Sequence, residues 1–541
     1  MTIHHDIDES LLHELSPPGV RWTTVNMAEV LPGVLTPLGW TFWREPCESG
    51  LRGAFADAGL LPASKVTPPA DLAGRLTGLF HGRLAGNLTM VCKLCDSMPG
   101  SSGAAFEEQV FGFADPNVER RRSFRRYPIV LAKMPIGLVL LPNRLGALRS
   151  EIDHWWRSAT GTVRVGSPEA RLAEAGRWLR KAMRRHMLAS LFAQACYDQV
   201  AGLARVAGEP GLELALMTGY GSMEETRISS DLWAVSRDRM TMAEFLNRHG
   251  FHGQSEGQLA SRSWREDCRG VEDICTRYRD LPDDQNPARR EEEQTRSRRA
   301  AEDKLIAALP LARRRLARLT LAIAARYLPL REVGKASFLQ AIDGARAAAR
   351  EIGDRLVDDG VIADRDEVFF ATLAEITGRP PADLRDRIAS RRSRNAEYAR
   401  FELPERWTGT PVPQRVASRP DEKRHDAAVL GVAVSPGVVE GCARVVHDPF
   451  GEIDFDAGDI LVCETTDPSW VVLFQLASAV VIDVGGAMSH GAIVARELGI
   501  PAVINTRNGT RIIKDRARIR VDGAAGRVDI LTSDTRSSDA T

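Results

Sequence analysis

A histidine in a glycine-rich turn is the residue of this sequence best placed to do chemistry. His490 lies in the string GGAMSHGAIVAR, residues 485–496, which follows an apolar run at residues 479–483. The apolar run predicts a buried strand, and the spacing of apolar residues after His490 predicts a helix that ends at Gly499. His490 is therefore expected at a helix N-terminus. Free backbone N–H groups and the positive end of the helix dipole suit an anion at this position.

This setting favours phosphoryl chemistry at the imidazole. The positive helix end disfavours the imidazolium, so His490 is expected to be neutral and able to attack through a ring nitrogen. A phosphorylated imidazole would have its charge met by the helix end, Ser489 and Arg496. Gly485 and Gly486 would let a phosphate or another backbone approach closely. The alternative is a strand–turn–helix unit in which the histidine only caps the helix.

The string as a whole resembles the phosphohistidine, or mobile, domain of phosphoenolpyruvate-utilising enzymes, a family that includes pyruvate phosphate dikinase and rifampin phosphotransferase. The resemblance extends over residues 428–532 and includes the strings SPG, ETTDPSW and VDGAAGRV. It implies an α/β swivelling domain in which His490 is the phosphoryl carrier. It also implies that Thr466, at the start of an expected helix capped by Asp467, lies near the phosphate. Met488 stands where some members have Thr, which leaves the nucleophile unchanged.

Composition and charge restrict the class of protein. The chain has 541 residues, enough for two to four domains, and 43% of them are hydrophobic. Its 72 basic and 72 acidic residues cancel, which argues against a general nucleic-acid or acidic-membrane binder. Eight scattered cysteines suit a reducing compartment. No signal-peptide pattern and no uncharged apolar run of membrane-spanning length are found. We therefore expect a cytoplasmic protein with no nucleic-acid or membrane partner.

The N-terminal part is expected to be a mainly α-helical domain over residues 21–402, after a lead-in at residues 1–20. The periodicity of apolar residues predicts helices near 168–206, 303–328 and 336–358. The strings LPGVLTPLGW, which contains Pro37, and RLAGNL resemble the substrate-binding domain of rifampin phosphotransferase. The resemblance implies that this domain binds the phosphoryl acceptor.

A second group of chemically capable residues lies between residues 245 and 257. Three glycines predict an extended loop here. His249, His252 and Glu256 suit either metal ligation or acid–base chemistry at an acceptor site. A helical zinc site would place its histidines four residues apart, so we expect no metal and assign these three residues to substrate binding. The segment up to residue 267 also resembles rifampin phosphotransferase.

Two segments are expected to lack regular structure. Residues 403–427 carry four prolines among polar residues, which predicts a semi-extended linker. Such a linker could let the domain at residues 428–532 swing over several tens of Å. The polar tail at residues 533–541 is expected to be disordered.

A site for the phosphoryl donor is not evident in the sequence. No glycine-rich loop followed by lysine appears, and the motifs that resemble the substrate domain begin near the N-terminus. We therefore expect one component of a phosphotransferase, which binds no cofactor directly. His490 would take a phosphoryl group from an ATP-binding, dikinase-like partner that uses ATP and Mg²⁺, and pass it to a small-molecule hydroxyl. The alternatives are a non-catalytic ligand-binding or regulatory homologue and a complete antibiotic kinase with an unrecognised ATP site.

Overall fold

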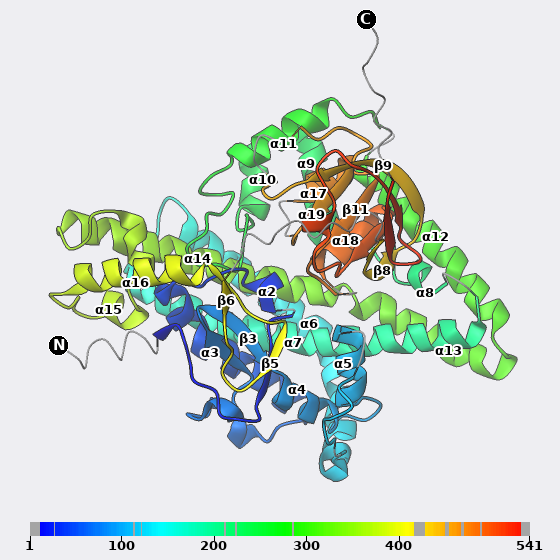
Figure 1. Ribbon diagram of the computed structural model, residues 1–541, viewed down its shortest axis with the longest axis horizontal. Helices are drawn as coiled ribbons and strands as arrows, with labels where there is room; N and C mark the ends of the chain where they lie inside the picture. Colours follow the sequence, from blue (N-terminus) through cyan, green and yellow to red (C-terminus); the bar gives the residue numbers. More distant parts are fainter. Residues whose placement is uncertain are drawn as a thin grey trace, which may run out of the picture. The chain divides into compact units, whose positions relative to one another are not determined.

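The computed structural model describes residues 11–531 except 26, 112–113, 121, 210–211, 222–223, 284–285, 416–427, 450–453, 467–469 and 487–488. The chain divides into two compact units (Figure 1). The first unit contains residues 1–195, 255–263 and 330–419, and the second contains residues 196–254, 264–329 and 420–541. The expected single domain over residues 21–402 is therefore wrong, because two of its segments cluster with the C-terminal region. The broader prediction of a helix-rich, multidomain chain with a strand-rich C-terminal domain is confirmed.

The first unit combines long helices with a small sheet. Its four-stranded sheet has the order β2-β3-β1-β5 and a two-stranded ribbon pairs β4 with β6. The strands are β1 (Arg21–Thr23), β2 (Thr77–Phe80), β3 (Arg83–Asn87), β4 (Phe401–Glu402), β5 (Arg406–Thr408) and β6 (Gln414–Arg415). The helices are α2 (Met27–Val30), α3 (Pro37–Asp57), α4 (Leu88–Cys95), α5 (Gly103–Phe111), α6 (Tyr127–Thr160), α7 (Pro168–Ala207, shared with the second unit), α14 (Leu330–Asp358), α15 (Leu373–Thr377) and α16 (Leu384–Tyr398). Short 3-10 helices are η1 (Ala63–Lys65), η2 (Leu72–Gly74), η3 (Phe124–Arg126) and η5 (Arg365–Phe370).

Two of these strands, β5 and β6, lie in the segment at residues 403–427 that the sequence predicts to be a linker. β5 pairs antiparallel with β1, so that Trp407 lies opposite Trp22, which is fully buried. β6 pairs with β4. Cross-strand pairing of this kind stabilises a sheet and docks the segment against its unit. The prediction of a linker from residue 403 is therefore wrong for residues 403–415, and residues 416–427 lie outside the described part of the chain.

Helix α6 departs from the expectation that no segment has the length and apolarity of a membrane span. Residues Phe124–Thr160 meet that test by length and composition alone, a test that the core helix of a soluble protein can also pass. The C-terminal half of α6 packs on α14, where Trp156 Nε1 donates a hydrogen bond of 2.8 Å to Asp343 Oδ2. A Cβ at Gly344 would overlap the Trp155 ring. The two helices therefore approach closely at a glycine.

The part of the second unit that the structure describes contains six helices of its own before its strand-rich part, and three of them share an apolar core. The six helices are α8 (Leu212–Ala215), α9 (Glu224–Ser236), α10 (Met242–His249), α11 (Arg269–Arg279), α12 (Pro287–Ala308) and α13 (Leu311–Tyr327). Phe245, Trp264 and Tyr278 lie in this core with apolar residues of α9 and α11. α10 begins with a capping box, in which Thr241 accepts from the Glu244 N–H and Glu244 accepts from the Thr241 N–H. The helix expected over 303–328 is interrupted at Leu309, and α13 follows with Pro310 as its N-cap residue.

The C-terminal part of the second unit is an eight-stranded sheet of order β7-β14-β13-β9-β10-β11-β12-β8. β9, β10, β11 and β12 are parallel, and the remaining strands are antiparallel. The strands are β7 (Val429–Leu430), β8 (Val432–Ser435), β9 (Val438–Val445), β10 (Ile460–Cys463), β11 (Ala479–Ile482), β12 (Ala502–Ile504), β13 (Arg518–Asp522) and β14 (Arg527–Ile530). β10, β11 and β12 are fully buried apolar runs, as expected for central parallel strands. The helices of this part are α17 (Val471–Leu476), α18 (His490–Leu498) and α19 (Gly509–Ile512).

Candidate functional site

His490 is the first residue of α18, as the sequence predicts. Ser489 is the N-cap residue, is 6% exposed, and accepts a 3.3 Å hydrogen bond from the Ala492 N–H. The turn before it is closed by a 2.9 Å hydrogen bond from the Ser489 N–H to the Gly486 carbonyl. The side chain of His490 lies outside the described part of the chain. Its role as phosphoryl carrier, and those of Ser489, Gly485 and Gly486 as phosphate ligands, stay predictions.

The start of α18 lies at the carboxyl ends of parallel strands, where open α/β sheets bind their ligands. The buried carboxylate of Asp483 follows β11 and joins this turn to the loop after β12. Asp483 Oδ1 accepts a 2.6 Å hydrogen bond from the Thr506 hydroxyl, and Oδ2 accepts from the Thr510 N–H at 3.1 Å and from the Thr510 hydroxyl. Asp483 thereby fixes the base of the turn that presents His490. Sequence analysis missed it, although a lone acid directly after an apolar strand was a visible signal.

Thr466 lies against the first turn of α18, in keeping with the role expected for it. A Cβ placed on Gly491 would come within 2.7 Å of Thr466 Oγ1 and would overlap Ile482. Glycine is therefore required immediately after His490 because the loop after β10 packs onto the helix start. Thr466 itself is only 8% exposed. Whether its hydroxyl binds phosphate stays a prediction.

Arg496 lies at the other end of α18. It is six residues after His490, which corresponds to about 9 Å along the helix axis. It is 3% exposed, and its charge acts on the ionisation of Tyr197 and Glu497. The structure thus places Arg496 near the Tyr197 phenol and the Glu497 carboxyl group. A contact of Arg496 with a phosphoryl group stays a prediction.

The strand-rich domain rests on helices that the sequence analysis assigned to the acceptor domain. Arg290 Nη1 of α12 donates a 3.0 Å hydrogen bond to Gln475 Oε1 of α17. Gly499, the left-handed C-cap of α18, lies so close to Gln294 of α12 that a Cβ there would overlap its amide. Nothing in the local sequence predicts these contacts, because they join residues about 200 positions apart.

Glu497 of α18 is a buried carboxyl group in the same part of the second unit. It is 4% exposed and lies beside the backbone N–H groups of Gly219 and Tyr220. Burial raises the pKa of Glu497 to about 7, although the Arg496 charge and the two N–H groups favour the carboxylate. The folded protein therefore holds this proton more tightly than the unfolded chain does.

The raised pKa of Glu497 predicts that the free energy of unfolding depends on pH. Because the folded-state pKa exceeds the unfolded value, the contribution of Glu497 to stability is fully present below pH 4.5 and is lost as the pH rises towards about 7, by on the order of 1–3 kcal/mol. Glu497→Gln should remove this loss and raise the free energy of unfolding at pH 8. Urea unfolding at pH 5 and pH 8 measures the effect. Glu440→Gln, which changes an exposed carboxylate of β9, is the control and should leave the pH profile unchanged; an unchanged profile in Glu497→Gln would contradict the prediction.

The residues expected at the acceptor site are divided between the two units. Pro37 is the first residue of α3 and Glu256 forms a 3.0 Å ion pair with Lys335, both in the first unit. His249 and His252 belong to the second unit. Their predicted substrate contacts are not tested by the structure.

Two strings that resemble the substrate domain do come together in the first unit. Gln258 Nε2 donates a 2.5 Å hydrogen bond to the carbonyl of Pro32, in the string that contains Pro37. Trp43 Nε1 donates a 3.1 Å hydrogen bond to the carbonyl of Gly257. The segment at residues 255–263 therefore packs directly on the segment before and at the start of α3.

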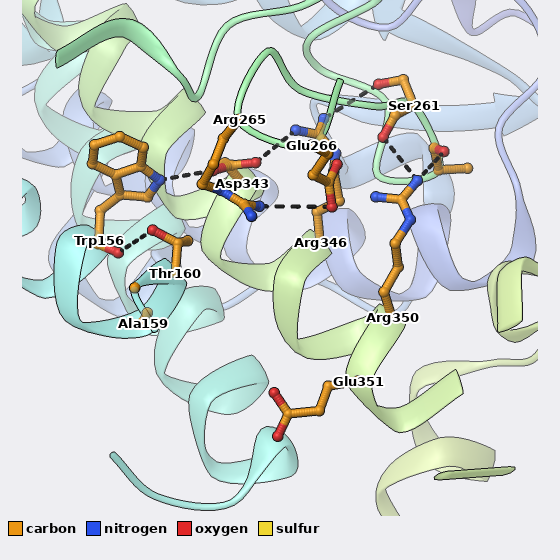
Figure 2. A network of polar contacts seen from close by, with 12 residues as sticks. Trp156, Ala159, Thr160, Ser261, Arg265, Glu266, Asp343, Arg346, Arg350 and Glu351 are labelled. Atoms are coloured by element: carbon orange, nitrogen blue, oxygen red, sulfur yellow. Dashed lines mark hydrogen bonds and ion pairs between the residues drawn. The ribbon is translucent and has the colours of Figure 1, made fainter. Parts of the chain in front are cut away.

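Two buried arginines of α14 hold the segment at residues 255–263 in place (Figure 2). Arg346 Nη2 donates to the carbonyls of Glu256 and Gln258 at 3.2 and 2.9 Å and to Ser261 Oγ at 3.2 Å. Arg350 Nη2 donates to the carbonyls of Ala260 and Ser261 at 2.9 and 3.2 Å. Both side chains are at most 3% exposed. The sequence analysis missed this pair, although two arginines four residues apart among small residues are a signal for buried charge.

His249 and His252 are buried beside Glu224 of α9, a residue that the sequence analysis did not single out. The His249 Nδ1 and Glu224 Oε1 atoms are 3.8 Å apart, and His252 Nε2 is 4.0 Å from the same oxygen. His249 Nε2 forms a 2.8 Å hydrogen bond with Asp231 Oδ2. The histidines therefore have acidic partners from another helix, which sequence spacing alone does not reveal.

Comparison with known proteins confirms the expected resemblance. Residues 455–526 match the PEP-utilising enzyme, mobile domain, and residues 236–332 match the rifampicin phosphotransferase fourth domain. The first match contains the turn and helix of His490, and the second contains the helices that carry its domain.

Several relatives of this chain are named phosphotransferases. The chain is 41% identical over 189 residues to a rifampicin phosphotransferase of Streptomyces sp, covering 35% of this chain and 22% of that protein. It is 37% identical over 208 residues to the rifampicin phosphotransferase of Streptomyces sviceus, covering 38% and 24%. It is 35% identical over 198 residues to the uncharacterized phosphotransferase YvkC of Bacillus subtilis, covering 35% and 24%. The matched part thus spans about a quarter of the length of these relatives.

A match to a solved structure adds nothing to this relationship. The NMR structure of an Enzyme I protein aligns over 68% of this chain and 81% of that chain, at 13% identity. Its TM-score is 0.15, which is too low to support a statement about the fold.

Proposed function

We propose that this chain, related to the rifampicin phosphotransferases, is a phosphotransferase component in which His490 carries the phosphoryl group. The observation that carries the proposal is the position of His490. It is the first residue of a helix, follows a glycine turn at the carboxyl ends of parallel strands, and lies within the region that matches the mobile domain. A helix N-terminus at this edge of the sheet is a site for an anion.

The proposed reaction has two steps. A neutral ring nitrogen of His490 attacks the phosphorus of the donor, the P–O bond to the leaving group breaks, and a P–N bond forms. The acceptor hydroxyl oxygen then attacks the same phosphorus, the P–N bond breaks, and the hydroxyl proton passes to a base. Each step moves a phosphoryl group through positioning and charge stabilisation. The N–H groups at the start of α18 that have no partner within the helix would stabilise the transferred charge in both steps.

We propose that the donor is ATP held with Mg²⁺ on an ATP-binding, dikinase-like partner. The acceptor would be a small-molecule hydroxyl bound by the helical N-terminal part, with Pro37, Glu256, His249 and His252 as candidate contacts. The names of the relatives favour an antibiotic of the rifampicin class as the acceptor to test first. In this proposal the C-terminal domain swivels between donor and acceptor in the cytoplasm, and its docking on α12 is one of its positions.

Intact-mass spectrometry tests the proposal. The purified chain is incubated with ATP and Mg²⁺, alone and with the isolated ATP-binding domain of a relative named rifampicin phosphotransferase. We expect one acid-labile, base-stable phosphoryl group only when that domain is present. Robust labelling of the chain alone would refute the partner, and the absence of labelling with this donor domain would refute the carrier role. Addition of rifampicin should then discharge the label.

A further inference from the structure

We propose that Glu224, His249 and His252 form a binding site for a divalent transition-metal ion, best suited to Zn²⁺. Their ligand atoms all lie within 4.8 Å of one another, and all three residues are buried. Two imidazoles and one carboxylate are a common ligand set for Zn²⁺, with a fourth position left for water or another ligand. The sequence analysis expected no metal, because the histidines are three residues apart; Glu224 is supplied by the beginning of a different helix.

The hydrogen bond of His249 shows which ring nitrogen is available. Asp231 Oδ2 lies 2.8 Å from His249 Nε2, so Nε2 carries the proton and donates it to the carboxylate. Nδ1 then has a lone pair, and it is buried with no hydrogen-bond partner among the described residues. A carboxylate that orients a histidine through its second nitrogen is the usual outer shell of a metal-binding histidine.

The lone pair of His249 Nδ1 faces a carboxylate oxygen, Glu224 Oε1, at 3.8 Å. Two acceptors in a buried space repel each other unless a proton or a cation lies between them. Glu224 and Asp231 are both acidic, and Arg248 lies 3.3 Å from Asp231. A divalent cation therefore suits the space between His249 Nδ1 and Glu224 Oε1 better than a single proton does.

The surroundings hold the three ligands in place. Phe245 packs on the His249 ring at 5.0 Å, and Trp264 packs on the His252 ring at 5.5 Å between centroids. The His252 carbonyl accepts a 2.7 Å hydrogen bond from the Trp264 N–H. In a tetrahedral zinc site with bonds of about 2.0–2.1 Å, ligand atoms lie about 3.3 Å apart. The observed separations of 3.8 and 4.0 Å, with all three ligand atoms within 4.8 Å of one another, are longer than this, so binding would draw the ligands together around the ion.

Metal titration of the full chain tests the site. The chain is stripped with a chelator and titrated with Zn²⁺ by calorimetry, and with Co²⁺ while its visible absorption is recorded. We expect one equivalent of each ion to bind, with Co²⁺ bands typical of nitrogen and oxygen ligands. Glu224→Gln and His249→Ala should each weaken binding at least tenfold, and Asp231→Asn should weaken it by about 10–100-fold.

Controls separate this site from other metal-binding groups. His154→Ala removes an exposed histidine of α6, and Cys95→Ser removes a thiol of the only CxxC pair in the sequence. Both should bind Zn²⁺ as the wild type does. If His249→Ala does not fold, the nearly isosteric Glu224→Gln decides the question. The proposal is overturned if the wild type binds no stoichiometric Zn²⁺, if Glu224→Gln binds it equally well, or if NMR shows His249 doubly protonated at pH 7 with Zn²⁺ present.

Discussion

Replacing His490 by alanine should abolish phosphorylation of the chain and leave its fold unchanged. The nucleophilic ring nitrogen is lost, and no other residue at the start of α18 has one. Alanine suits the first turn of a helix, and the N-cap is a hydrogen bond from the Ala492 N–H to the Ser489 hydroxyl, which the substitution leaves in place. Intact-mass analysis after incubation with the ATP-binding domain and ATP should show no phosphoryl group, whereas the wild type carries one.

The matched control is His447→Ala. His447 is the only other histidine in residues 428–532 and is exposed, so its removal should leave phosphorylation at the wild-type level. Both variants should have the circular dichroism and unfolding midpoint of the wild type. Phosphate on another residue of the His490→Ala variant would show that the carrier has been misassigned. Loss of phosphorylation in the control would show that the assay reports folding instead of chemistry.

Replacing Asp483 by alanine should destabilise the C-terminal domain and slow phosphorylation of His490. The 3%-exposed carboxylate accepts hydrogen bonds from the Thr506 hydroxyl and from the N–H and hydroxyl of Thr510. Without it, the half-buried N–H and hydroxyl of Thr510 lose their acceptor, and the Thr506 hydroxyl keeps only the Ile482 carbonyl at 3.1 Å. Each unsatisfied group costs about 1–3 kcal/mol. We expect the free energy of unfolding to fall by about 3 kcal/mol. The turn that carries His490 should lose its fixed position.

Urea unfolding and the rate of phosphorylation measure these two effects. Asp483→Asn keeps the shape and one acceptor oxygen, so it should lie between alanine and the wild type in both measurements. Asp456→Ala, at an exposed position of the same domain, is the control and should change neither. Wild-type stability and rate in Asp483→Ala would mean that the turn is held by other contacts.

Contacts with the C-terminal domain explain why two segments of the expected acceptor domain cluster with the C-terminal region. The sequence analysis includes residues 196–254 and 264–329 in the expected acceptor domain over residues 21–402. In the structure, Arg290, Gln294 and the backbone at Gly219 contact α17 and α18. One of these segments includes most of the region that matches the rifampicin phosphotransferase fourth domain. The C-terminal strand-rich domain therefore packs on α12.

Residue patterns within about ten positions determined the local structure around His490. The apolar run of β11, the glycine turn and the helical spacing up to Gly499 predict a strand, a turn and a helix, because each depends on backbone geometry and on neighbouring residues. The same local reading placed His490 at the first position of α18 and identified β10, β12 and the closing strands. It failed at residues 403–415, where proline content suggested a linker and pairing with β1 and β4 decided otherwise.

Only the tertiary structure decided which distant residues meet. Glu224 reaches the two histidines, Glu497 is buried against Gly219, and Arg346 holds residues 255–263 across 80 or more positions of sequence. No local pattern encodes such pairs, because a contact between distant segments depends on how whole helices pack and on which charges are buried together. The sequence by itself therefore determined the position of His490 in its turn and at the start of its helix. The packing of helices determined the contact of the strand-rich domain with α12, the acidic partner of His249 and the burial that raises the pKa of Glu497.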